Sequence, residues 1–334
     1  MKSRSLHLSV SFALIVFITY SLQAQSSLEA ISVKGNIFVS ESGKKMIFQG
    51  VNIRDPHQLK EDGVWTKAHF EKAKDWGSDL VRLPVHPGAW NNRGEQAYLE
   101  LLDEAVTWAG ELGMYLIIDW HSIGNLSEAK FQNPMYNTTF EETKEFWNTI
   151  SKHFKDEPIV AMYELYNEPT VSGKNFGNMS WKTWKKMNVE MIELIRKNDP
   201  KTVILVAGFN WAYDLTPIKD DAIDMENIAY VSHPYPEKRD QPWEEKWEED
   251  WGFVAKKHPV ILTEIGFALP DERGAHVPVK GDETYGNALV DFCNARGVSW
   301  VVWCFDNRWS PFMYTGDYEP TRQGAFFRDV MRRQ

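Results

Sequence analysis

Cysteine is scarce in this chain of 334 residues, which contains only Cys293 and Cys304. A framework of disulfide bonds is therefore excluded, and a chain of this length can bury a large apolar core without one. A single bridge between the two cysteines stays open, but nothing in the sequence fixes the geometry that it would need. We expect two buried free thiols.

Clusters of basic residues are also missing. The chain has 37 Lys and Arg against 47 Asp and Glu, a formal net charge of −10. Nucleic acids and anionic membrane surfaces are therefore poor partners, whereas neutral substrates are compatible with this charge. Neither a Walker-type phosphate loop nor a strand-following GxGxxG motif is present. Tryptophan, in contrast, is abundant at 15 residues, and its side chain either fills cores or offers a flat face to a ligand ring.

Long apolar runs are confined to the start of the chain. Lys2 and Arg4 precede an apolar segment at residues 6–22, and Ala24 supplies a small residue at a plausible cleavage point. This pattern is typical of a secretory signal peptide over residues 1–24, and the run is short for a membrane span. We expect residues 25–334 to form a single catalytic domain that is secreted or periplasmic and makes no membrane contact after cleavage.

The rest of the chain repeats one unit, a short apolar strand followed by a segment of helical periodicity. About eight such repeats predict an α/β fold, a single (β/α)8 barrel with right-handed crossovers. An alternating segment at residues 31–39 predicts a short N-terminal β-hairpin that closes the bottom of the barrel. The expected strands are residues 46–53, 80–85, 115–120, 159–166, 203–207, 228–232, 260–265 and 300–305, and the longest helices are 95–112, 140–154, 180–198 and 284–296.

Polar residues follow most of these strands, at the end where barrel enzymes carry their chemistry. Residues 163–169, YELYNEP, present Glu168 just after a buried strand, and Pro169 is expected to stop further strand pairing. Glu264 is a second carboxylate inside an apolar strand, where burial without partners would be costly. Other strands end near Arg82, His121, His233, Tyr235 and Trp303. Two converging carboxylates predict hydrolysis of a glycosidic bond.

With these residues in place, the sequence resembles glycoside hydrolase family 5, a family of (β/α)8 retaining glycosidases. The resemblance runs from about Met46 to the C-terminus and rests on Arg82, His121, Asn167-Glu168, His233-x-Tyr235, Glu264 and Trp303. It implies that Glu168 is the general acid/base, that Glu264 is the nucleophile and that Asn167 holds the sugar 2-hydroxyl.

The resemblance also implies roles around this pair. Arg82 and Tyr235 would flank Glu264, His121 and His233 would hydrogen-bond the sugar or the carboxylates, and Trp303 would form the floor under the reacting sugar. Independently of the family, Trp211 follows the fifth strand and is a candidate platform for a further sugar ring, with packing as the equal alternative.

The two carboxyl groups should differ in pKa. Arg82 should lower the pKa of Glu264, and an ionised Glu264 should raise the pKa of Glu168. This separation suits a nucleophile and a proton donor, and it predicts a bell-shaped pH profile.

The expected activity is endo-acting, retaining cleavage of a β-linked neutral polysaccharide. By resemblance, an endo-β-1,4-glucanase (cellulase) comes first, with β-mannanase, other β-glucanases, xyloglucanase and xylanase as alternatives on the same barrel. A barrel that binds glycan without cleaving it belongs to a different class. No cofactor is expected, and no metal, because Asp119, His121, His233 and Asp306 lack the spacing of zinc motifs. The expected state is a monomer.

Overall fold

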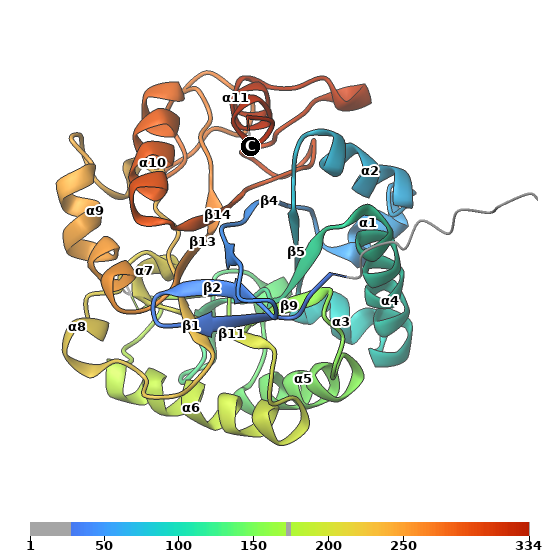
Figure 1. Cartoon of the computed structure of the whole chain (residues 1–334), viewed down its shortest axis with the longest axis vertical. Helices are drawn as coiled ribbons and strands as arrows, with labels where there is room; N and C mark the ends of the chain where they lie inside the picture. The colour runs from blue at the N-terminus through green and yellow to red at the C-terminus, as the bar shows by residue number, and fades with distance from the viewer. Residues whose placement is uncertain (1–27, 172–174, 334) are drawn as a thin grey trace, which may run out of the picture.

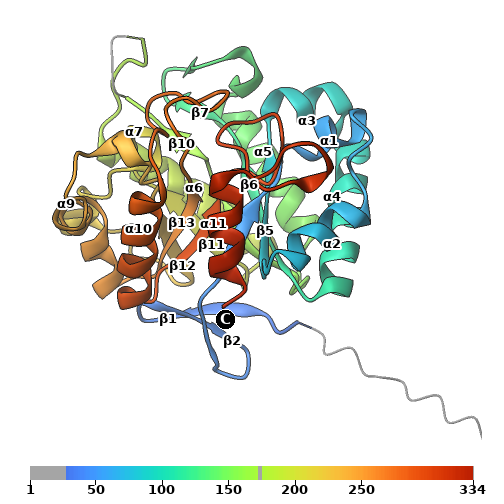
Figure 2. The same cartoon turned by 90° about the horizontal axis from the view of Figure 1, so that it is seen from above.

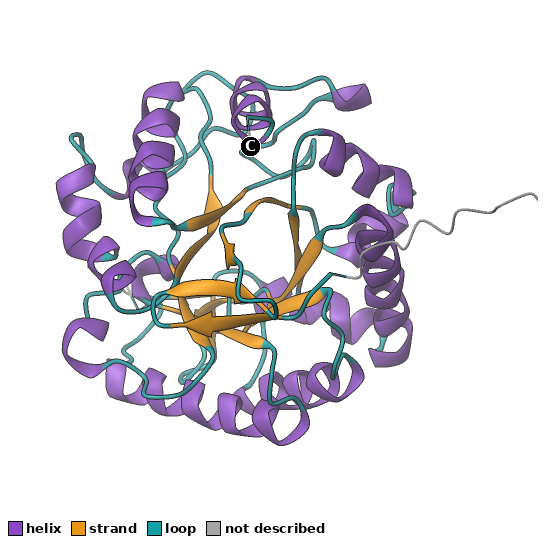
Figure 3. Ribbon diagram, in the orientation of Figure 1, coloured by secondary structure: helices purple, strands orange, loops and turns teal. Residues whose placement is uncertain are grey.

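The computed structural model describes residues 28–171 and 175–333. Eight parallel strands form a closed barrel inside a ring of helices (Figure 3). The predicted (β/α)8 barrel is confirmed, and each strand lies within a few residues of its predicted position. The predicted signal peptide, residues 1–24, lies outside the described residues. The barrel strands are β4 (Gln49–Asn52), β5 (Leu80–Val85), β6 (Tyr115–Trp120), β9 (Val160–Glu164), β11 (Val203–Ala207), β12 (Ile228–Val231), β13 (Val260–Ile265) and β14 (Ser299–Val302).

The helices cover the outer face of the barrel (Figure 1). The four long helices predicted from periodicity are α4, α5, α6 and α10, and α4 and α10 end at Gly113 and Gly297 in left-handed backbone, as expected for glycine at a helix end. The full set is α1 (Pro56–Glu61), α2 (Lys67–Asp75), α3 (Pro87–Arg93), α4 (Glu95–Leu112), α5 (Phe140–His153), α6 (Trp181–Asn198), α7 (Phe209–Ala212), α8 (Ile218–Asp221), α9 (Glu244–Asp250), α10 (Glu283–Arg296) and α11 (Arg322–Met331). Short 3-10 helices lie at η1 (Pro134–Tyr136), η2 (Pro236–Lys238), η3 (Gly252–Lys256) and η4 (Gly316–Tyr318).

The N-terminal hairpin is present at the predicted place and lies below the barrel (Figure 2). It consists of β1 (Ile31–Lys34) and β2 (Ile37–Ser40), joined by a tight turn. A third strand, β3 (Lys45–Met46), pairs with β2. Met46 was expected to begin the first barrel strand, and this is wrong, because the edge of β2 takes residues 45–46 and the barrel strand β4 starts only at Gln49.

The barrel closes where its last strand meets its first. β14 pairs in parallel with β4, with Trp300 opposite Gln49 and Val302 opposite Val51. The side chain of Asn52 crosses this seam, since its Nδ2 donates to the carbonyl oxygens of Thr263 at 2.8 Å and of Val302 at 3.3 Å. The first and last strands of the barrel, which are far apart in the sequence, are thus held together directly beneath the residues discussed below.

The end of the barrel that lies opposite the N-terminal hairpin carries the longer connections, including β7, β10 and α7 (Figure 2). A second small sheet forms there from β7 (Ile123–Asn125), β8 (Lys130–Phe131) and β10 (Glu168–Pro169). Cys293 and Cys304 are buried free thiols, as expected. Over the described ranges, no helix has the length and apolar character needed to cross a membrane.

Candidate active site

Arg82 organises the upper part of the barrel interior. On β5, Leu80 belongs to the inner core whereas Val81 and Leu83 pack against the helices, so the two-residue period of the strand turns Arg82 inward. Its guanidinium is fully buried and donates to both oxygens of Glu164, at 2.7 and 3.0 Å. A buried cation of this kind requires such partners, because an unpaired charge in the interior is strongly destabilising.

The same guanidinium reaches four further groups. Its Nη1 donates to Asn52 Oδ1 at 2.8 Å and to Glu264 Oε1 at 3.1 Å. Its Nη2 donates to Asn167 Oδ1 at 2.7 Å and lies 3.0 Å from Asp119 Oδ2. Five side chains from the ends of four barrel strands are therefore oriented by one arginine.

Glu264 reaches the site through an irregularity in β13. The register of the β13–β14 pair shifts between Leu262 and Ile265, both of which pack in the outer core. Such shifts re-aim a side chain that strict alternation would turn outward. As a result, Glu264 can accept hydrogen bonds from Arg82 through Oε1 and from Tyr235 through Oε2, the latter at 2.9 Å.

Glu168 lies beyond the end of its barrel strand. β9 ends at Glu164, and Glu168 and Pro169 then form β10, which pairs in parallel with β7. The expectation that Pro169 stops strand pairing is wrong. Pairing continues because the N–H groups on either side of the proline, those of Glu168 and Thr170, donate to Ser122 and Gly124 at 3.0 and 3.1 Å. Proline is tolerated there because β10 is an edge strand.

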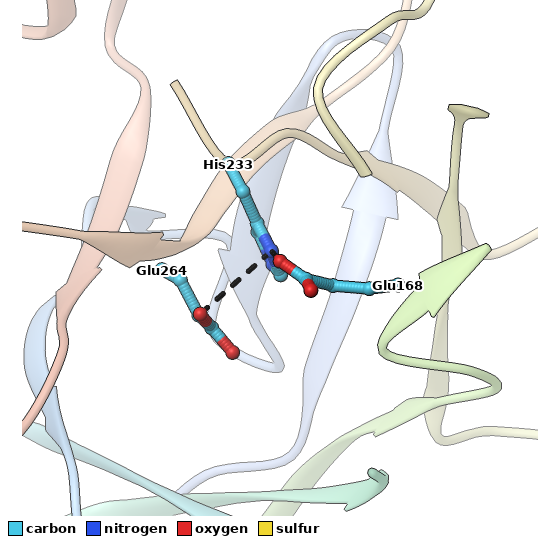
Figure 4. A group of neighbouring side chains, drawn as sticks. All are labelled: Glu168, His233 and Glu264. Carbon is cyan, nitrogen blue, oxygen red and sulfur yellow. Dashed lines mark hydrogen bonds and ion pairs between the residues drawn. The ribbon is translucent and has the colours of Figure 1, made fainter. Parts of the chain in front are cut away.

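The two carboxyl groups meet at His233, which follows β12 (Figure 4). The Nδ1 atom of His233 lies 3.0 Å from Glu168 Oε1 and 3.9 Å from Glu264 Oε2. One oxygen of each glutamate and one ring nitrogen of His233 all lie within 4.8 Å of one another. Retaining glycosidases place their two carboxyl groups about 5–5.5 Å apart, whereas inverting enzymes leave room for a water molecule between groups about 6.5–9.5 Å apart.

The same three residues could in principle hold a metal ion. Glu264, however, already accepts from Arg82 and Tyr235, and His233 already bonds Glu168. A guanidinium 3.1 Å from Glu264 would also repel a divalent cation. The donor set therefore fits a hydrogen-bonded acid pair better than it fits a metal.

Burial governs the pKa values at the site. Desolvation raises the pKa of Glu168 to about 7, against a smaller lowering by Lys238 and Arg82. The predicted direction is thus correct, but its main cause is burial and not Glu264. Desolvation also raises the pKa of Glu264, although His233, Arg82 and Tyr235 oppose this. The predicted lowering is wrong, because the loops that remove water from the site outweigh the arginine.

A cavity of about 750 Å³ opens above the pair and is lined by both glutamates. Asn167 also lines it, and its Nδ2 has no hydrogen-bond partner among the described residues. Trp303 lies on the cavity wall with its ring stacked on His121, at a centroid distance of 5.3 Å. His121 in turn is held by Asp119, with 2.6 Å between Nδ1 and Oδ2.

Trp211 lines the same cavity. Its Nε1 donates to Gln132 Oε1 at 2.9 Å, and the ammonium of Lys238 lies 5.1 Å from its ring centroid. Asn210, Trp211 and Ala212 all have left-handed backbone, with φ of 57°, 55° and 56°. This conformation is uncommon for residues other than glycine and often marks a functional segment.

Three residues at the site were not identified from the sequence. Glu164 and Thr263 are fully buried in the barrel interior. The sequence contained a signal for Glu164, because it is a charged residue inside the apolar run that precedes Asn167. Lys238 lines the cavity and donates to Asn210 O at 2.8 Å. It ends the three-residue 3-10 helix η2, which is too short to give a periodic signal.

Comparisons with known proteins agree with this geometry. A family model described as "Cellulase (glycosyl hydrolase family 5)" matches residues 39–308. Endoglucanase A of Evansella cellulosilytica is 28% identical over 70% of this chain and 44% of its own length. An endoglucanase of Paenibacillus polymyxa is 24% identical over 89% of this chain and 84% of its own length. This chain thus spans less than half the length of the first of these relatives.

Among solved structures, a β-glucanase from Saccharophagus degradans is 47% identical, with a TM-score of 0.90 over 92% of this chain and 94% of that one. The same β-glucanase has also been solved in complex with cellotetraose, with a TM-score of 0.91 and 46% identity.

Proposed function

This chain belongs to glycosyl hydrolase family 5, and on that premise we propose that it is a retaining endo-β-1,4-glucanase, a cellulase. The observation that carries the proposal is the pair Glu168 and Glu264, which place one carboxyl oxygen each within 4.8 Å of the other and of a ring nitrogen of His233. This close approach agrees with the separation of about 5–5.5 Å in retaining enzymes and not with that of about 6.5–9.5 Å in inverting ones, which favours direct attack by one carboxylate.

In the proposed mechanism, Glu264 is the nucleophile and Glu168 the general acid. A carboxylate oxygen of Glu264 forms a bond to the anomeric carbon while the glycosidic bond breaks, and Glu168 gives its proton to the departing oxygen. In the second step Glu168 takes a proton from water, the water oxygen bonds to the anomeric carbon, and the bond to Glu264 breaks. Arg82 and Tyr235 hold the attacking carboxylate in place.

The remaining site residues then act on the sugar. The unpartnered Nδ2 of Asn167 is available to a hydroxyl at the 2-position, because Oδ1 is already bound to Arg82. His121 and Trp303 stack on each other in the cavity wall, and Trp211, which lines the same cavity, forms a platform for a neighbouring sugar. Cellotetraose bound to the β-glucanase from Saccharophagus degradans supports a β-glucan as the substrate.

Substitution of the two glutamates tests the catalytic roles. Wild-type protein should release reducing sugar from carboxymethylcellulose, and Glu168→Gln and Glu264→Gln should each lower the rate at least about a thousandfold. Unchanged release from both variants would contradict the assignment and leave a glycan-binding barrel. The anomeric configuration of the first product, followed by NMR, should be retained, and inversion would contradict the double displacement.

A panel of substrates separates the alternatives within the family. Carboxymethylcellulose should be hydrolysed faster than mannan, laminarin, xylan or xyloglucan, with oligosaccharides of mixed length as early products. Release of a single short product from the outset would contradict endo action. Full activity in excess EDTA is expected, and its loss would favour a metal-dependent hydrolase.

We further propose that the protein is exported and acts as a monomer. The basic, then apolar, then small-residue pattern over residues 1–24 supports export. Mass spectrometry of protein expressed from the full chain should find an N-terminus near residue 25.

A further inference from the structure

Resting on the proposed function, we infer that Thr263 and Glu164 are positioning residues that determine which nitrogen of His233 carries a proton, and that they thereby keep Glu168 protonated before it acts as an acid. None of the three touches the bond to be cleaved. The chain of hydrogen bonds that connects them to Glu168 gives each proton only one possible place.

The chain begins at Glu164. Its carboxyl group accepts two N–H donors from Arg82, at 2.7 and 3.0 Å, and both side chains are fully buried. A carboxylate paired in this way can only accept hydrogen bonds. Thr263 Oγ1 lies 2.9 Å from Glu164 Oε1, so the single hydroxyl proton of Thr263 is donated to Glu164.

The next link is His233. Its Nε2 lies 2.9 Å from Thr263 Oγ1. Because the hydroxyl proton of Thr263 is donated to Glu164, Thr263 Oγ1 can only accept a hydrogen bond from His233. Nε2 of His233 must therefore carry the hydrogen. A neutral imidazole has one protonated nitrogen, so Nδ1 is left with a lone pair.

That lone pair faces the acid. Nδ1 lies 3.0 Å from Glu168 Oε1, and a hydrogen bond forms at this contact only if the carboxyl group supplies the proton. A hydrogen bond of this kind stabilises the neutral acid and disfavours the carboxylate. The alternative, a doubly protonated His233, is opposed by burial, which lowers the pKa of His233 to about 4, and by Arg82.

Charges of both signs surround the contact between Glu168 and His233. The cations that act on Glu168 or His233 are Arg82 and Lys238, and the anions are Glu164, Glu264 and Asp119. His121, Tyr136 and Tyr235 complete the set of titratable neighbours. A substitution of Thr263 removes no charged or titratable group, and besides its contact with His233 it removes only the hydrogen bond from Thr263 Oγ1 to Glu164 Oε1.

The arrangement serves both chemical steps. Before cleavage the lone pair of His233 holds the proton on Glu168. After Glu168 has protonated the leaving oxygen, its carboxylate faces that lone pair without a hydrogen bond, which makes it a stronger base toward the incoming water.

Thr263→Val is the decisive variant, because valine keeps the shape and removes the hydroxyl. Nε2 of His233 would then lose its hydrogen-bond partner, and Glu164 Oε1, at 4.0 Å, is too far to replace it. We expect the proton to move to Nδ1 and to be donated to Glu168, which stabilises its carboxylate. The alkaline limb of kcat/KM should therefore move to lower pH by about one unit.

Substrates with different leaving groups provide a readout that a merely structural role would not change. Hydrolysis of β-glucan needs the acid, and its kcat/KM should fall about fivefold in Thr263→Val at pH 7, as expected for a pKa that moves by about one unit from about 7. An aryl β-cellobioside with a dinitrophenol leaving group does not need protonation, and its kcat/KM, which reports the first step alone, should stay within about twofold. Thr263→Ser keeps the hydroxyl and should restore both the alkaline limb of the pH profile and the rate of glucan hydrolysis.

Ser232→Ala is the matched control, because its buried hydroxyl lies next to His233 in sequence but donates to Tyr213 O at 2.9 Å. It should leave the pH profile in place. In wild-type protein, nitrogen–proton NMR of the imidazole should find the hydrogen on Nε2 alone. This measurement does not require Thr263→Val to fold.

The possible results are distinct. A hydrogen on Nδ1 in the wild type, or an alkaline limb that does not move in folded Thr263→Val, would overturn the inference while the glycosidase function stands. Wild-type protein without activity on any glucan would overturn the proposed function instead.

Discussion

Glu168→Gln should make the folded protein more stable, by an amount that grows with pH. The carboxyl group of Glu168 has an ordinary pKa of 4.5 in the unfolded chain and one of about 7 in the folded protein, because it is buried. Below pH 4.5 it is neutral in both states, and glutamine should change little. Between these values the unfolded state ionises while the folded state stays neutral, so wild-type stability falls as pH rises.

This loss of wild-type stability is complete above pH 7, where Glu168 is ionised in both the folded and the unfolded state. The difference of about 2.5 units corresponds to about 3 kcal/mol. Glutamine avoids this loss because it has no charge, and its amide can donate to Nδ1 of His233 as the protonated acid does. We therefore expect Glu168→Gln to unfold several degrees higher than wild type at pH 8 and at nearly the same temperature at pH 4.

Thermal unfolding measured from pH 4 to pH 8 tests this reasoning. Glu245→Gln, at an exposed position on α9, is the control, and its difference from wild type should not depend on pH in this way. A stability difference for Glu168→Gln that stays constant from pH 4 to pH 8 would refute the conclusion that burial keeps Glu168 protonated.

Three further outcomes are expected. The profile of kcat/KM on a soluble glucan should be bell-shaped, with its alkaline limb near pH 7 from Glu168 and its acid limb above 4.5 from Glu264; constant activity up to pH 9 would contradict it. Lys238→Met should move the alkaline limb upward by about one unit, because the lysine charge lowers the pKa of Glu168; a downward shift would show that another group sets the limb. Trp211→Ala should raise KM for long glucans about tenfold with little change in kcat, measured by initial rates; an equal loss in kcat would place Trp211 at the reacting sugar.

Much of the fold follows from local sequence. Most barrel strands are short apolar runs, and the stops at Gly113 and Gly297 are glycines that adopt left-handed backbone. The convergence of Arg82, Glu168 and Glu264 was also predictable, because a closed barrel brings the ends of all its strands together.

What could not be predicted depends on contacts between distant segments. The pKa of Glu264 depends on how completely several loops exclude water, and no stretch of sequence carries that information. The inward turn of both Thr263 and Glu264 depends on a register shift against β14. Lys238 reaches the cavity from the short 3-10 helix η2, whose position is set by tertiary packing.

The barrel seam has a consequence for the synthesis of the protein. Glu168 is made when half the chain has been translated, but Asn52 binds the carbonyl oxygens of Thr263 and Val302, and β4 lacks one neighbour until β14 exists. A nascent chain released between residues 264 and 299 therefore contains both glutamates and cannot close the ring that positions them. Activity should appear abruptly with the last strand, so that truncated translation products do not release sugar.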